Sequence, residues 1–147
     1  MRIWDYRLLP YLPDLQFKGQ LRELVAIMHD WRDKGKTNHL LINKVMDYPK
    51  SELYTYFLLY TACYKERYGK WIDYKEFAQF ADYKCKDVIT VSEIGLFQGW
   101  HNDTYLNTCM WNLYEKHLAV GKSRVTDEEW AKLCKGYKNI TGKDFKE

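Results

Sequence analysis

Apolar residues recur at steps of three and four positions through the first third of the chain, beginning after Pro13. This period is typical of one face of an α-helix, and Asp14 is a favourable residue for the helix N-cap. The pattern therefore predicts an amphipathic helix from Asp14 to about Asp33, which Gly35 ends. Its apolar stripe consists of Phe17, Leu21, Leu24, Val25, Met28 and Trp31.

A second helix is predicted from Glu52 to about Tyr68, after Pro49 and Ser51 and before Gly69. Its apolar residues cover more than one face of the helix. They are Leu53, Tyr56, Phe57, Leu58, Leu59, Tyr60 and Cys63. A helix that is apolar on several faces is typically buried, so we expect this helix to lie at the centre of the fold.

The rest of the chain carries shorter helical patterns, over residues 74–81, 105–118 and 130–136. The last of these follows Thr126-Asp127-Glu128-Glu129, which has the spacing of a capping box. Residues 87–97 contain a cluster of β-branched side chains, and the pattern leaves a strand and an irregular segment open.

These elements predict an all-α fold, with residues 1–147 forming a single compact domain. In this fold the long N-terminal helix packs on the central buried helix. The last residues of the chain are rich in lysine and contain glycines, so we expect about ten of them to be loosely ordered.

Composition narrows the class of protein but does not decide it. The 147 residues carry a net charge of +3 and an aromatic share of 17%, which is compatible with nucleic-acid binding without requiring it. No apolar run approaches the roughly 18 residues of a membrane span, and no signal peptide is apparent. We therefore expect an intracellular, cytoplasmic protein. The four histidines are scattered, which predicts no metal site.

The polar face of the first long helix carries two small residues where long polar side chains are usual. Gly19 and Ala26 project between Arg22 and Glu23 on the side opposite the apolar stripe. Glycine costs about 1 kcal/mol relative to alanine inside a helix, so two small residues here suggest the close approach of another chain segment or of a ligand backbone. An incidental glycine beside a solvated Arg and Glu is the alternative.

The start of the chain, Met1-Arg2-Ile3-Trp4, precedes Gly19 and Arg22-Glu23-Leu24 on this helix. This arrangement resembles the pyrimidine-dimer DNA glycosylase family, that is, the endonuclease V type of phages and its bacterial relatives. Residues 43–56, with Pro49 and Leu53-Tyr54-x-Tyr56, are similar to a segment of those relatives, as is the charged stretch 65–69. The resemblance covers about the first half of the chain and fades after Trp71.

The resemblance implies a DNA repair glycosylase with associated AP lyase activity on damaged double-stranded DNA. It implies that the α-amine of Met1 is the nucleophile, that Glu23 assists as acid and base, and that no cofactor is needed. An α-amine has an ordinary pKa near 8, so a usable fraction is neutral at cellular pH. A neighbouring carboxylate stabilises positive charge that develops on the sugar and can then carry protons.

The same resemblance implies that Arg2 and Arg22 contact phosphates around the lesion. We expect further phosphate contacts from Lys132, Lys135 and Lys138, and a monomeric protein. A bulky and poorly stacked lesion lowers the cost of bending the duplex and flipping a base.

The chain also departs from the family pattern. Arg2 should prevent removal of Met1, whereas the phage type exposes a small residue. Ala26 stands where the phage type has a second arginine, and Leu21 stands where many bacterial relatives have a histidine. Two other functions are therefore open: a non-catalytic helical module that binds nucleic acid or protein, and an enzyme for another modified pyrimidine.

Overall fold

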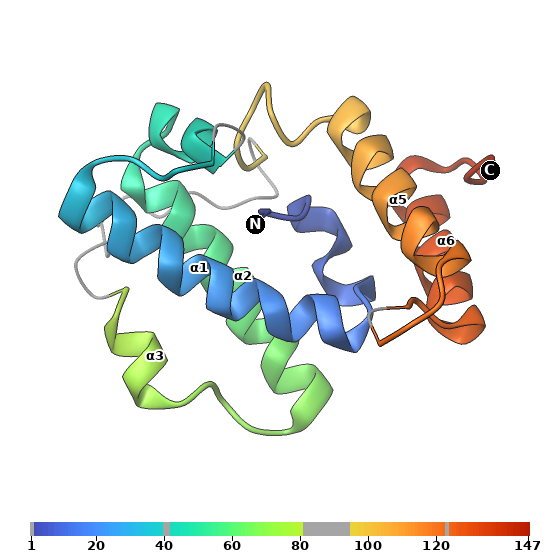
Figure 1. Ribbon diagram of the computed structural model, residues 1–147, viewed down its shortest axis with the longest axis horizontal. Helices are drawn as coiled ribbons and strands as arrows, with labels where there is room; N and C mark the ends of the chain where they lie inside the picture. Colours follow the sequence, from blue (N-terminus) through green and yellow to red (C-terminus); the bar gives the residue numbers. More distant parts are fainter. Residues whose placement is uncertain (1, 40–41, 81–94, 123) are drawn as a thin grey trace. The chain divides into compact units, whose positions relative to one another are not determined.

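The computed structural model describes residues 2–39, 42–80, 95–122 and 124–147. All regular elements within these ranges are α-helices or short 3-10 helices, which confirms the all-α fold (Figure 1). None of the helices in the described part has the length and apolarity that crossing a membrane requires.

The described chain divides into two compact units. The first contains the described residues of Met1–Ile3 and Gln20–Trp100, and the second contains those of Trp4–Gly19 and His101–Glu147. The boundary between them passes through a helix, between Gly19 and Gln20. The single folding domain stays a prediction, and the two units are described separately below.

The first unit is built on α2 and on the part of α1 from Gln20 onward. Helix α1 spans Asp14–Lys34, with Gly35 after it at a φ of 68°, which confirms the predicted C-terminal end. Asp14 is the first residue inside the helix and not its N-cap, since the Phe17 N–H donates to the Pro13 carbonyl. Helix α2 spans Lys50–Tyr68 and ends at Gly69, which adopts the left-handed conformation that glycine tolerates best. The two helices run side by side in Figure 1, and a hydrogen bond joins them at Gln20 and Tyr56.

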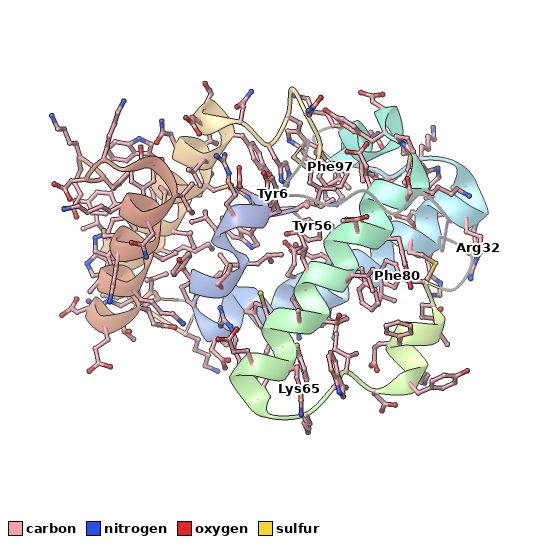
Figure 2. The ribbon with its side chains drawn as sticks, turned by 180° about the vertical axis from the view of Figure 1, so that it is seen from behind. Tyr6, Arg32, Tyr56, Lys65, Phe80 and Phe97 are labelled. Atoms are coloured by element: carbon pink, nitrogen blue, oxygen red, sulfur yellow. The ribbon has the colours of Figure 1, made fainter. Side chains whose placement is uncertain are left out.

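The first half of α2 is buried on nearly all sides, as its apolar sequence predicted. Its buried residues are Ser51, Glu52, Leu53, Tyr54, Thr55, Tyr56, Phe57, Tyr60 and Thr61. The Phe57 and Phe80 rings stack with their centroids 3.9 Å apart. Figure 2 labels Tyr56 and Phe80 within the first unit. Helix α2 thus supplies the core of this unit.

Among its described residues, the first unit also contains two short elements. They are the 3-10 helix η2 (Ile42–Asp47) and the helix α3 (Tyr74–Ala78), which lies within the predicted 74–81 segment. Of the predicted segment 87–97, residues 87–94 lie outside the described residues. Residues 95–97 are irregular.

Phe97 is held in an uncommon conformation next to the core of the first unit. Its φ is 53°, a region that bulky residues rarely occupy. The Phe97 backbone N–H donates to the buried Glu52 carboxylate at 2.9 Å, and the Phe97 ring lies 6.1 Å from the Tyr56 ring, centroid to centroid. Together these contacts hold the segment against α2.

The second unit contains the 3-10 helix η1 (Tyr6–Tyr11) and the helices α5 (Asp103–Leu118) and α6 (Asp127–Thr141). The capping box predicted at Thr126 and Glu129 is present at the start of α6. Helix α6 continues past Gly136, where the sequence pattern placed its end. The Tyr137 hydroxyl donates to Asn107 Oδ1 at 2.7 Å and so ties α6 to α5.

Gly136 explains how η1 packs so closely on α6. A Cβ atom at this position would lie 2.5 Å from Tyr11 Cδ2 and 2.7 Å from Tyr11 Cδ1, well inside van der Waals contact. The glycine therefore removes a side chain that the Tyr11 ring would otherwise meet. The chain end beyond α6 is also in contact with this unit, since Trp130 Nε1–H donates to Glu147 Oε1 at 2.8 Å.

Candidate active site

The amino-terminal segment lies directly on α1 in the first unit. The Arg2 backbone N–H donates a hydrogen bond to Glu23 Oε2 at 3.1 Å. This is the approach of a chain segment that the small residues Gly19 and Ala26 led us to expect. The glutamate and the start of the chain, more than twenty positions apart in sequence, are therefore adjacent in space.

Gln20 connects the same two groups from one turn before Glu23. Its amide nitrogen Nε2 donates to the Arg2 carbonyl oxygen at 2.9 Å and lies 3.4 Å from Glu23 Oε2. Its amide oxygen Oε1 accepts from the Tyr56 hydroxyl at 3.1 Å. Both Gln20 and Tyr56 have an exposed fraction of 0%. Sequence reasoning missed these two residues.

The surroundings of Glu23 favour its neutral form. Burial raises the pKa of the Glu23 carboxyl above its ordinary value, and the hydrogen bond from Arg2 together with the charges of Arg2 and Arg22 only partly opposes this rise. Both hydrogen bonds to the carboxylate end on Oε2, and no described residue forms a hydrogen bond with Oε1. One carboxylate oxygen is thus anchored and the other is not.

The remaining predicted site residues of the first unit are Met1 and Arg22. Met1 lies outside the described residues. Arg22 follows Leu21 on α1 and is exposed, and within the described part of the chain its guanidinium forms no hydrogen bond or ion pair. The exposed guanidinium next to the glutamate can meet an anion such as a phosphate without first breaking an ion pair.

The three predicted lysines lie on α6, in the second unit. Lys132, Lys135 and Lys138 are all exposed. The Lys138 ammonium forms an ion pair with Asp144 at 3.3 Å, between two largely solvent-exposed side chains. Such a pair contributes little to stability, so it would yield readily to a phosphate.

Glu23 offers a partly buried carboxyl group for chemistry. In the part of the chain that the structure describes, His, Cys, Asp and Glu side chains do not gather in the groups of three that would hold a metal ion. A partly buried carboxyl group with a raised pKa can donate a proton as well as accept one, which suits a role as general acid and base.

Residues 1–73 match the family model described as pyrimidine dimer DNA glycosylase. This match covers just under half of the chain, confirms the expected resemblance to the family and supports a DNA glycosylase kind of function. No significant match was found among curated proteins or among solved structures.

Proposed function

We propose that the protein excises a damaged pyrimidine, a cyclobutane dimer or a related lesion, from double-stranded DNA and then nicks the strand as an AP lyase. The nucleophile is the Met1 α-amine, and Glu23 is the acid and base. The observation that carries the proposal is the hydrogen bond from the Arg2 N–H to Glu23 Oε2 at 3.1 Å. It fixes the residue that follows Met1 directly on the carboxylate.

Covalent geometry supports the choice of this amine. Only the Cα and carbonyl carbon of Met1 stand between its α-amine and the Arg2 nitrogen, so standard bond lengths keep the two nitrogens within about 4 Å of each other. Because the Arg2 nitrogen contacts Glu23, the amine is tethered to the neighbourhood of the carboxylate. With an ordinary pKa near 8, roughly a tenth of such amines are neutral at pH 7.

The reaction proceeds in two stages that use these groups in turn. The neutral amine forms a bond to C1′ of the deoxyribose while the glycosidic bond breaks, and the base leaves with the electron pair of that bond and takes up a proton. Loss of the amine proton and opening of the sugar ring give an imine. Removal of a C2′ proton then expels the 3′ phosphate by β-elimination and nicks the strand.

Glu23 serves both stages through its two protonation states. As a carboxylate it stabilises the positive charge that develops on the sugar and accepts the C2′ proton. As a carboxylic acid, the form that burial favours, it returns a proton to a leaving group. Oε1, with which no described residue forms a hydrogen bond, is the oxygen available for these transfers.

DNA binding rests on a small number of exposed cations. In the first unit Arg22 contacts a phosphate near the lesion, together with Arg2. In the second unit Lys132, Lys135 and Lys138 on α6 contact further phosphates. With a net charge of only +3, we expect weak binding to intact DNA and a shallow dependence on salt.

Borohydride reduction tests the proposal, because it converts an imine between protein and DNA into a stable amine bond. The protein is incubated with duplexes that carry a cyclobutane pyrimidine dimer, an abasic site or no lesion. We expect a covalent adduct with the damaged duplexes and none with intact DNA. A matched protein with extra residues ahead of Met1 serves as the control and should form no adduct. Absence of an adduct with every lesion would overturn the lyase mechanism.

A further inference from the structure

One buried amide joins three separate segments of the first unit. Gln20 on α1 contacts the amino-terminal segment at the Arg2 carbonyl, its own helix at Glu23, and α2 at the Tyr56 hydroxyl. Gln20 occupies a position where the helix otherwise buries apolar side chains, since Phe17 and Leu24 precede and follow it at steps of three and four. A polar side chain in such a stripe calls for a reason beyond packing.

The partners determine which way the amide is turned. The Arg2 carbonyl can only accept a hydrogen bond, so the amide nitrogen must face it. The amide oxygen then faces the Tyr56 hydroxyl, which must be the donor in that contact. The Arg2 carbonyl therefore selects the amide orientation in which the nitrogen points at both Arg2 and Glu23, and the Tyr56 hydroxyl supports it by donating to the amide oxygen.

This arrangement treats the two oxygens of Glu23 differently. The Gln20 nitrogen and the Arg2 N–H both approach Oε2, and no other described side chain forms a hydrogen bond with Oε1. The last torsion of a glutamate side chain is broad, so without these donors the carboxylate could turn about its axis. The two donors restrict that rotation and hold Oε2 against the Arg2 backbone.

We propose that Gln20 is a positioning residue, which fixes the amino-terminal backbone and the Glu23 carboxylate in one geometry, and that the hydrogen bond from the Tyr56 hydroxyl helps to hold the Gln20 amide in place for this purpose. The inference rests on the proposed function, since it concerns the same amine and the same carboxylate. Gln20 itself touches neither the sugar nor the base. It acts by holding the Arg2 carbonyl, and through it the tethered amine of residue 1.

The test compares Gln20→Met and Tyr56→Phe with the wild-type protein. Methionine has a similar length but offers no donor to Arg2, and phenylalanine lacks only the hydroxyl. The matched control is Tyr137→Phe, which removes a defined hydroxyl bond at 2.7 Å to Asn107 in the second unit. Single-turnover base release and borohydride adduct formation are measured across pH, and melting temperature and DNA affinity are measured in parallel.

We expect Gln20→Met to lower the single-turnover rate by about 100-fold, as a misplacement of about 1 Å would, with DNA affinity unchanged. Tyr56→Phe lowers the rate less, in the same direction, and the control leaves it unchanged. In Gln20→Met the acidic limb of the pH profile also moves to higher pH. The reason is that a loosened Arg2 N–H no longer lowers the pKa of Glu23, whereas the charges that also lower this pKa, those of the amino terminus, Arg2 and Arg22, remain in the variant.

A merely structural role would lower the melting temperature and leave the shape of the pH profile unchanged. Wild-type rates and an unshifted profile in both variants would overturn the inference alone, with the proposed function intact. If Gln20→Met does not fold, Tyr56→Phe decides the matter, and a wild-type rate in that variant overturns the inference. A wild-type protein that forms no adduct would overturn the proposed function instead, and the inference with it.

Discussion

Replacing Glu23 by glutamine separates the charge of this side chain from its geometry. The amide oxygen of Glu23→Gln can take the place of Oε2 and accept from the Arg2 N–H and from Gln20, so both contacts are retained. Only the ability to ionise and to carry a proton is lost. A positioned acid or base contributes about 10²–10⁴-fold to a rate, which corresponds to about 3–5 kcal/mol of transition-state stabilisation.

The same substitution should not destabilise the fold, and this is the sharper part of the prediction. Burial raises the pKa of Glu23 in the folded protein above its unfolded value of about 4.5. The stability that this group contributes is therefore fully present below that unfolded pKa and is lost as the pH rises through the folded pKa. Glu23→Gln avoids the loss, so its melting temperature at pH 7 should equal or exceed that of the wild type, with the difference shrinking toward pH 4.

Two measurements on the same protein samples check both parts. Single-turnover release of the damaged base, followed on a labelled duplex, gives the rate, and thermal unfolding monitored by circular dichroism gives the melting temperature at each pH. Fluorescence anisotropy confirms that DNA binding is retained. A rate within tenfold of the wild type would refute the role of Glu23 as acid and base. A lower melting temperature at neutral pH would refute burial as the dominant influence on its pKa.

Three further results are expected. Gly136→Ala should lower the stability by about 1–2 kcal/mol in thermal unfolding, because its overlap with the Tyr11 ring outweighs the gain of about 1 kcal/mol in helix propensity; an increase would contradict the packing of η1 on α6. Burial lowers the pKa of His101 to about 3. Stability should therefore fall as the pH drops below about 6.5, and His101→Gln should flatten this slope in acid titrations. Arg22→Ala should weaken DNA binding and reduce the slope of log affinity against log salt by about 0.9 in anisotropy titrations, with the melting temperature unchanged.

The regular elements of the first unit could be predicted from the sequence because their signals are local. The three- and four-residue steps from Phe17 to Trp31 define α1, and glycines with positive φ follow both α1 and α2. The capping box at Thr126 is equally local, since both of its hydrogen bonds lie within one turn. Helix α6 was predicted too short because Gly136 looks like a terminator, whereas in the structure it makes room for Tyr11.

The candidate site could be predicted only in part. The small residues near Glu23 indicated that a chain segment approaches α1, and the resemblance of the first residues pointed to the amino terminus. Gln20 could have been singled out from periodicity alone, because it is a polar residue within the apolar stripe of α1. The role of Tyr56 could not have been predicted from the sequence. Its hydrogen bond to Gln20 forms between α2 and α1, so it depends on how the two helices pack.

The most direct test of the mechanism is to locate the DNA on the protein after borohydride reduction. Wild-type protein is reduced with a duplex that carries the lesion, digested with nuclease and protease, and mapped by tandem mass spectrometry. The proposed mechanism predicts a sugar remnant on the α-amine of Met1, next to the Arg2 that contacts Glu23. A remnant on a lysine side chain, with an unmodified Met1 amine, would contradict it.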